Sequence, residues 1–261
     1  MSLDAILSGL LAGKPRLEAG HVWLVGAGPG DPALLTLEAV SALTQCDALV
    51  HDALVSREIV EVAAHAEPFY VGKRGGRLSI PQGDINALLV RLARDGRRVV
   101  RLKGGHPLVF ARGGEEALAL VEAGIPYRVL PGVTSAFGGL ASAGIPASMR
   151  GVNGAITLAT GFAAVSDDRP DWRALARTGQ PIVIYMGLTH IAATVSDLLA
   201  GGLPAATPAA LIENATLPEE RTVVATLGTL VEAMERENIV SPALIVVGGI
   251  VALRQRLRPG A

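Results

Sequence analysis

The sequence predicts an α/β protein built from two α/β units. Short apolar runs alternate with helix-periodic segments along almost the whole chain, which is typical of parallel strands joined by helical crossovers. The 261 residues, half of them hydrophobic, suffice for one large domain or two small ones. A stretch dense in glycine and small residues, 130–146, interrupts the alternation. We expect an N-terminal extension at 1–20 and two α/β domains at 21–133 and 134–257, packed around a cleft.

Five strands are expected in the first domain, and each is a short run rich in apolar and β-branched residues: 22–26, 48–51, 69–71, 98–102 and 127–130. Helix-periodic segments at 34–45 and 85–96 lie between them. In the second domain the expected strands lie at 155–160, 181–186, 209–212, 222–226 and 243–248. Some of these runs are separated only by short turns, which is compatible with a mixed sheet.

Charge and hydropathy disfavour several classes of protein. The 23 basic and 24 acidic side chains nearly cancel, so no global field would recruit nucleic acid or an anionic membrane. The longest uncharged run, 242–253, is too short to span a bilayer, and no early basic cluster marks a signal peptide. The single cysteine, Cys46, rules out an intrachain disulfide and is expected in the core. We expect a cytoplasmic protein with no nucleic-acid or membrane partner.

The turn after the first expected strand, GAGPGDP at residues 26–32, looks at first like a dinucleotide-binding turn. Gly26 and Gly28 fit the first two positions of the G-x-G-x-x-G fingerprint, but Asp31 takes the third. We interpret Asp31 as a helix N-cap and Pro32 as the first helical residue. A capping carboxylate would occupy the place of a pyrophosphate, which disfavours a dinucleotide. The glycines would let something approach the strand end closely.

Two basic, glycine-rich loops follow expected strands. The loop at 70–85 carries Lys73, Arg74 and Arg77, and the loop at 99–117 carries Lys103, Arg112, Glu115 and Glu116 into a helix. Both should lie at the carboxyl edge of the sheet, where ligands of open α/β folds bind. Solvated loops would have a similar composition, but two such loops at one edge favour a binding site.

The basic residues also suggest the kind of ligand. All but three of them are arginine, whose guanidinium fork suits a substrate with several carboxylates, although genome base composition is the favoured explanation for the surface arginines. The histidines show no metal-ligand spacing, so we expect no bound metal: they are His21, His51, His65, His106 and His190.

Several motifs are long and specific. They include VGAGPGDPALLTL at 25–37, VGKRGG at 71–76, VVRLKGGHPLVFARGGEEALALVEAGIP at 99–126, PGVTSA at 131–136 and SPALIVVG at 241–248. With HDALVS, AGIPAS and IYMGL, they resemble the tetrapyrrole methylase family from residue 22 to about 257, in order and without large gaps.

The resemblance implies the tetrapyrrole methylase fold, with S-adenosyl-L-methionine bound in a cleft between two α/β domains, and a homodimer. Within the family, the motifs are most similar to those of enzymes that methylate uroporphyrinogen III at carbons 2 and 7 to give precorrin-2. S-adenosyl-L-homocysteine is the other product. The sequence leaves open whether precorrin-2 goes on to cobalamin or to sirohaem.

Roles follow from the resemblance residue by residue. Asp52 matches the family's proposed proton acceptor and Lys73 its proposed proton donor. Arg112, Glu115 and Arg150 match positions implicated in substrate binding and catalysis. The implied cofactor contacts, many of them backbone atoms, are Pro29, Gly104, Gly105, His106, Val109, Thr134, Ser135, Met186, Ala215 and Ala243.

The chain departs from the family pattern at three places. His106 stands where the family usually has the aspartate of GGDP, and His51 replaces the tyrosine before the matching aspartate. Ser148 and Met149 replace a threonine and a histidine before the matching arginine, which puts the substrate pocket there in doubt. Two histidines near the site would make activity titrate near neutral pH.

Three other functions remain open from the sequence. One is a methyltransferase of the same family that acts on a later precorrin. Another is a nicotinamide-dependent oxidoreductase, which would need pyrophosphate at the turn that Asp31 opposes. The third is a binding protein that has lost catalysis, and the presence of Asp52, Lys73, Arg112 and Glu115 argues against it.

Overall fold

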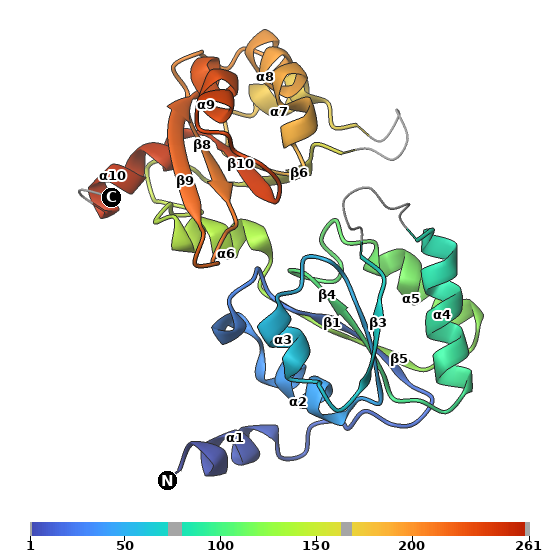
Figure 1. Cartoon of the computed structure of the whole chain (residues 1–261). Helices are drawn as coiled ribbons and strands as arrows, with labels where there is room; N and C mark the ends of the chain where they lie inside the picture. Colours follow the sequence, from blue (N-terminus) through green and yellow to red (C-terminus); the bar gives the residue numbers. More distant parts are fainter. Residues whose placement is uncertain (1, 73–79, 163–168, 259–261) are drawn as a thin grey trace. The chain divides into compact units, whose positions relative to one another are not determined.

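The computed structural model of the chain describes residues 2–72, 80–162 and 169–258 (Figure 1). The chain divides into two compact units, Met1–Thr134 and Ser135–Ala261, and each contains one five-stranded sheet with helices. The α/β class expected from the sequence is confirmed in both units.

The first unit is built around a parallel sheet of order β3-β2-β4-β1-β5. Its strands are β1 (Val22–Gly26), β2 (Ala48–His51), β3 (Glu67–Tyr70), β4 (Val99–Lys103) and β5 (Tyr127–Leu130). Its helices are α1 (Leu3–Leu11), α2 (Leu37–Gln45), α3 (Arg57–Glu61), α4 (Gln82–Arg94) and α5 (Gly113–Glu122), with a 3₁₀ turn, η1, at Pro32–Leu34.

Side chains of the central strands alternate between two buried faces, which fixes their register. Trp23 and Val25 of β1 pack in the cluster that contains buried residues of α2 and α3. Val22 and Leu24 face the other way, into the cluster formed with α4 and α5. The parallel sheet is therefore covered on both sides, as Figure 1 shows.

The second unit has a mixed sheet of order β6-β7-β10-β8-β9, in which β6 and β7 are parallel and the other neighbours antiparallel. Its strands are β6 (Thr157–Thr160), β7 (Ile182–Tyr185), β8 (Pro208–Glu213), β9 (Arg221–Thr226) and β10 (Ala243–Val247). Its helices are α6 (Ser135–Ser142), α7 (Trp172–Arg177), α8 (Ile191–Ala200), α9 (Leu230–Arg236) and α10 (Arg254–Leu257), with 3₁₀ turns η3 (Leu188–His190), η4 (Leu227–Thr229) and η5 (Gly249–Leu253).

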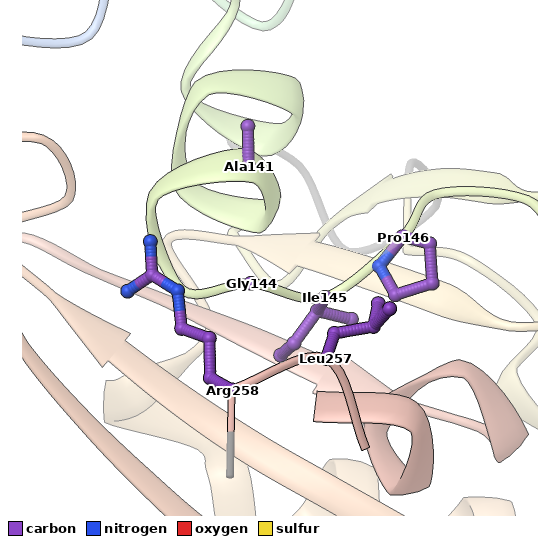
Figure 2. Close-up of a pocket in the computed structure, with 6 residues that line it drawn as sticks. All are labelled: Ala141, Gly144, Ile145, Pro146, Leu257 and Arg258. Atoms are coloured by element: carbon purple, nitrogen blue, oxygen red, sulfur yellow. The ribbon is translucent and has the colours of Figure 1, made fainter. Parts of the chain in front are cut away.

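Helix α6 occupies part of the stretch that the sequence marks only as an interruption. Close packing explains Gly139, because a Cβ there would lie 2.9 Å from Leu244 and 3.0 Å from Ala215. At its end, a shallow hollow is lined by Ala141, Gly144, Ile145, Pro146, Leu257 and Arg258, where the chain after α10 lies beside Gly144 (Figure 2). None of the site residues expected from the sequence lines this hollow.

Cys46 lies in the core of the first unit, as expected from the sequence. It is 1% exposed, and its Sγ donates to the carbonyl of Leu43 at 3.3 Å. Burial raises the pKa of this thiol to about 11. Among the helices of the described ranges, none has the length and apolar character needed to cross a bilayer.

Candidate active site

Most of the expected site residues of the first unit lie at the carboxyl edge of its sheet. All five strands are parallel, so the segments that follow them emerge at one edge. Asp52 follows β2 directly, and Gly104 follows the neighbouring strand β4. Pro29 lies on the turn after β1, which is the other neighbour of β4. The structure therefore brings the predicted proton acceptor and the glycine loops to the same edge.

The loops after β1 and β4 are joined by backbone hydrogen bonds. Gly28 and Gly105 exchange two of them, with N···O distances of 3.2 and 2.7 Å, and the N–H of Ala27 donates to the carbonyl of Lys103. Gly28 and Gly105 both have positive φ angles, 72° and 69°, which residues other than glycine rarely adopt.

Gly26 and Gly132 allow a second close approach at this edge. A Cβ on Gly26 would lie 2.5 Å from the N atom of Gly132, and one on Gly132 would lie 2.3 Å from the carbonyl oxygen of Gly105. The sequence predicts that something approaches the end of β1 closely. In the structure, the group that approaches the end of β1 is the protein's own backbone, at Gly132 and Gly105.

Asp31 caps the short 3₁₀ turn η1. Its Oδ1 accepts from the N–H of Ala33 at 2.8 Å, so it is an N-cap and Pro32 is the first helical residue, but the helix is the 3₁₀ turn η1. The long helix α2 starts at Leu37, where the hydroxyl of Thr36 caps the N–H of Ala39. The prediction of Asp31 as an N-cap and Pro32 as the first helical residue is confirmed, and the turn that they open ends after two i→i+3 bonds, from Leu34 N–H and Leu35 N–H.

Behind Asp52 lies a chain of buried charges. Arg101 Nη2 donates to Asp52 Oδ1 at 2.6 Å, and Arg101 Nε donates to Glu116 Oε1 at 3.0 Å. Lys103 Nζ donates to the same Oε1 at 2.8 Å, and Gln82 Nε2 lies 3.3 Å from it. The side chains of Arg101 and Lys103 are each 2% exposed, that of Glu116 is fully buried, and that of Asp52 is 30% exposed. The network thus runs from the core to a carboxylate at the sheet edge.

Burial and the adjacent Arg101 guanidinium lower the pKa of Lys103, although Glu116 acts in the opposite direction. The second carboxylate oxygen of Glu116, Oε2, is buried and has no hydrogen-bond partner among the described residues. The donors that reach Glu116 from Arg101, Lys103 and Gln82 therefore all converge on Oε1.

Lys103 and Glu116 were expected only as members of a basic loop, without a role of their own in the site, and Arg101 was not expected as a site residue. One signal could have found them. Arg101 and Lys103 are two positions apart on a strand, so their side chains lie on one face of the sheet. Two cations on one face of a central, otherwise apolar strand require a buried anion. Glu116 lies one helical turn from the buried Leu120, on the packed side of α5.

The two unusual histidines have different settings. His106 Nδ1 accepts from the N–H of Leu108 at 3.1 Å, so this side chain closes its own turn. The ring of His51 lies edge-on to Tyr70, with centroids 5.5 Å apart, and its Nδ1 lies 3.3 Å from the carbonyl oxygen of Asp52.

Arg112 and Glu115 form a bidentate ion pair. Arg112 Nε and Nη2 lie 2.8 and 2.7 Å from the two carboxylate oxygens of Glu115. The pairing raises the pKa of Arg112 and lowers that of Glu115. Both side chains are more than half exposed. Arg112 has a left-handed backbone, φ 59°, immediately before α5.

The second unit gathers three of the expected cofactor contacts at one edge of its sheet. Ala243 pairs with Glu213 at the end of β8, and Ala215 follows two residues later. The pairing of Ile245 with Ile184 places Met186 level with Ala243 on the other side of β10. Met186 has φ 52° and is 48% exposed.

The ion pair between Glu213 and Arg221 stabilises this edge of the sheet. Glu213 is 3% exposed; its Oε2 accepts from Arg221 Nε at 2.6 Å, and its Oε1 accepts from the N–H of Val240 at 2.9 Å. Burial raises the pKa of Glu213, but these two donors outweigh it and lower the pKa overall. Arg221 also donates to the carbonyls of Glu237 and Asn238, in the segment before β10.

The remaining expected residues are spread over both units. Val109 lies on the loop before α5, Thr134 is buried and Ser135 begins α6. Arg150 is exposed, between α6 and β6. Lys73 lies outside the described residues. Among the described residues, no cluster of histidine, cysteine and carboxylate side chains could hold a metal ion.

Comparison with known families decides which α/β protein this is. The model of the tetrapyrrole (corrin/porphyrin) methylases matches residues 21–231. The chain belongs to this family. This tetrapyrrole methylase is 47% identical over 255 residues to a uroporphyrinogen-III C-methyltransferase of Sinorhizobium sp, which covers 97% of this chain and 91% of the relative.

Two further similarities extend the comparison. A siroheme synthase of Methylobacillus flagellatus is 45% identical over 95% of this tetrapyrrole methylase, but the match covers 53% of the relative, so the chain spans about half its length. In structure, the chain is similar to uroporphyrin-III C-methyltransferase of Thermus thermophilus complexed with S-adenosylhomocysteine. The TM-score is 0.78 at 38% identity, covering 89% of this chain and 99% of the other.

Proposed function

We propose that this tetrapyrrole methylase transfers methyl groups from S-adenosylmethionine to carbons 2 and 7 of uroporphyrinogen III and so forms precorrin-2. The Sinorhizobium relative supports the substrate, and the S-adenosylhomocysteine complex of the Thermus protein supports the cofactor. The structural observation that carries the proposal is the carboxylate of Asp52, which Arg101 holds at 2.6 Å at the same sheet edge as the Gly104–Gly105 loop.

The loops proposed to hold the cofactor fit a ligand without phosphate groups. The segments 26–32 and 104–109 contain no lysine or arginine that could bind a pyrophosphate. Their titratable side chains, Asp31 and His106, both accept hydrogen bonds from backbone N–H groups of their own turns. When bound, S-adenosylmethionine supplies a methyl group on a sulfonium, with a neutral thioether as leaving group.

Asp52 is the proposed proton acceptor. An electron-rich pyrrole carbon that gains a methyl group leaves positive charge on its ring, and a proton must then depart. A fixed carboxylate stabilises that charge and can take the proton. Asp52 meets both needs because one of its oxygens is held by a buried guanidinium while 30% of its side chain is exposed.

Arg112, Glu115 and Arg150 are the proposed substrate contacts. Arg112 uses Nε and Nη2 for Glu115, which leaves the Nη1 donors for a substrate carboxylate. Exposed apolar side chains accompany it on the loops after β2 and β4, and they suit the apolar faces of pyrrole rings: Leu54, Leu108 and Phe110 are 65%, 52% and 42% exposed.

Lys73 is the proposed proton donor, on the sequence resemblance alone. The proposed cofactor contacts are those expected from the sequence: Pro29, Gly104, Gly105, His106, Val109, Thr134, Ser135, Met186, Ala215 and Ala243. We still expect the chain to form a homodimer, which sedimentation equilibrium would measure. The expected compartment is the cytoplasm.

The proposal is tested by anaerobic incubation of the chain with uroporphyrinogen III and S-adenosylmethionine, followed by mass analysis of the tetrapyrrole. We expect a gain of two methyl groups. If S-adenosylhomocysteine binds but no methyl group is gained, the proposed substrate is wrong. Stabilisation by NAD but not by S-adenosylhomocysteine in thermal unfolding would instead favour the oxidoreductase.

A matched pair of variants tests the role of Asp52. Asp52→Asn should lower kcat by about 10²-fold or more, because a positioned general base contributes that much. Asp47→Asn removes a carboxylate that also pairs with an arginine, Arg98, but at the amino end of β4. It should leave kcat unchanged. Equal losses in the two variants would remove the basis for assigning Asp52.

A further inference from the structure

We propose that Glu116 is a positioning residue, which fixes the Arg101 guanidinium so that Arg101 holds Asp52 in its reactive orientation. Glu116 is fully buried in the first turn of α5, so it is not exposed to a substrate as Asp52 is. The inference rests on the proposed function, because it assigns Asp52 a part in the reaction.

Arg101 can link the two carboxylates because its guanidinium is a rigid planar fork. The Nη2 atom of Arg101 donates to Asp52 Oδ1 at 2.6 Å, while its Nε donates to Glu116 Oε1 at 3.0 Å. A third donor, Nη1, bonds to the carbonyl of Leu102 at 3.2 Å. With three acceptors in different directions, the guanidinium has one orientation, and the position of Asp52 Oδ1 follows from it.

Glu116 is itself fixed by its neighbours. Its Oε1 accepts from Lys103 Nζ at 2.8 Å and lies within 3.3 Å of Gln82 Nε2. Gly113 brings the start of α5 against the loop after β4, since a Cβ there would lie 2.2 Å from the carbonyl oxygen of Pro107. Anionic side chains are favoured in the first turn of a helix. The acceptor for Arg101 thus belongs to a rigid element.

The charges of the network balance only as a set of four. Arg101 and Lys103 are two buried cations, and Asp52 and Glu116 are the two anions that contact them. A variant that changes Glu116 alone would therefore also leave a buried charge uncompensated. For this reason, the test changes Lys103 and Glu116 together.

The decisive comparison is between K103M/E116Q and K103M/E116M. Both double variants remove one cation and one anion, and they differ mainly in whether an oxygen remains at position 116 to accept from Arg101 Nε. Gln82 donates to the same place, which favours the amide oxygen there in the glutamine variant. The readouts are kcat for methylation per S-adenosylhomocysteine-binding site, KM for both substrates, and the thermal midpoint.

We expect K103M/E116Q to keep kcat within a few-fold of wild type. K103M/E116M should lose about 10²-fold in kcat, the scale of effect for a misplacement near 1 Å, with the cofactor KM unchanged. Normalising to binding sites removes any loss through misfolding, which a purely structural role would cause. Equal kcat values per site in the two variants would overturn the inference.

Two further variants test whether Glu116 acts through its neighbours. If it acts through Asp52, adding Asp52→Asn to K103M/E116M should lower kcat no further than Asp52→Asn alone; full additivity would overturn the inference. Arg101→Lys keeps a charge but cannot reach two carboxylates at once, so it should be as slow as Arg101→Met. A wild-type chain that adds no methyl group would instead refute the proposed function, and the inference with it.

Discussion

Nδ1 of His106 accepts a hydrogen bond from the N–H of Leu108, 3.1 Å away, and thereby closes the turn that follows β4. An aspartate side chain at this position can accept from the same N–H group, as in an Asx turn. The side chain that departs from the family pattern therefore keeps the local hydrogen bond. The bond requires Nδ1 to be unprotonated.

His106→Asp should bind S-adenosylhomocysteine with an affinity within about threefold of wild type, because the acceptor is retained. His106→Ala should lose about 1 kcal/mol of unfolding free energy and bind more weakly, because the N–H of Leu108 loses its partner. Calorimetric titration and urea unfolding measure both. Equal affinities of H106D and H106A would contradict the role of Nδ1 as the acceptor.

Gly132→Ala should be one of the most damaging small substitutions in the first unit. The new Cβ would meet the backbone oxygen of Gly105 at 2.3 Å, and backbone atoms cannot rotate away as a side chain can. We expect a loss of about 3 kcal/mol or more in unfolding free energy. Gly83→Ala is the control, since nothing lies within 4 Å of its Cβ position, and it should be neutral or slightly stabilising. Similar losses for both would show that the edge can relax.

Glu116→Gln alone should make stability depend on pH in a defined direction. Lys103 then loses its buried anion, and its pKa, already lowered from 10.5 by burial and by Arg101, falls further. Between the folded and unfolded pKa values the unfolded chain binds more protons, so stability rises with pH in that window. We expect a deficit of about 3 kcal/mol at pH 7 that shrinks towards pH 10 in urea unfolding. K103M/E116Q should not show this dependence, because it has no lysine to titrate there.

Arg221→Met should weaken cofactor binding although Arg221 is not among the proposed cofactor contacts. The substitution leaves the buried Glu213 carboxylate without its charged partner and frees the segment before β10 from two hydrogen bonds. We expect a loss of about 2 kcal/mol in unfolding free energy and a several-fold weaker affinity for S-adenosylhomocysteine. Arg173→Met, which breaks the exposed pair with Asp197, is the control and should change neither quantity much.

The sequence predicted several strands of the first sheet well because their signal is local. The observed bounds of β1, β2 and β5 match the expected ranges 22–26, 48–51 and 127–130. Strand β3 starts at Glu67, two residues before the expected range, because Glu67 and Pro68 lie outside the apolar run on which the prediction rested. Helix α6 was missed since its close packing selects glycine and serine, which are poor helix formers.

The site was predictable where backbone and motif determine it, and much less so where side chains meet across elements. The loop after β4 was expected at the carboxyl edge of the sheet and lies there, beside Asp52, which follows the neighbouring strand β2. Glu115 and Glu116 are adjacent in sequence, yet one forms an exposed pair with Arg112 and the other is fully buried beside Arg101. Which glutamate turns inward depends on how α5 packs on β4, and that is a tertiary property.

Cys46 is so unreactive that other positions of the chain can be labelled through a thiol. With a pKa of about 11, on the order of one thiol in ten thousand is ionised at neutral pH, and the side chain is 1% exposed. Since the sequence contains no other cysteine, a thiol introduced on the surface would react with a maleimide almost alone. Fluorophores or spin labels can therefore be attached at chosen positions in either unit while Cys46 stays in place as native packing.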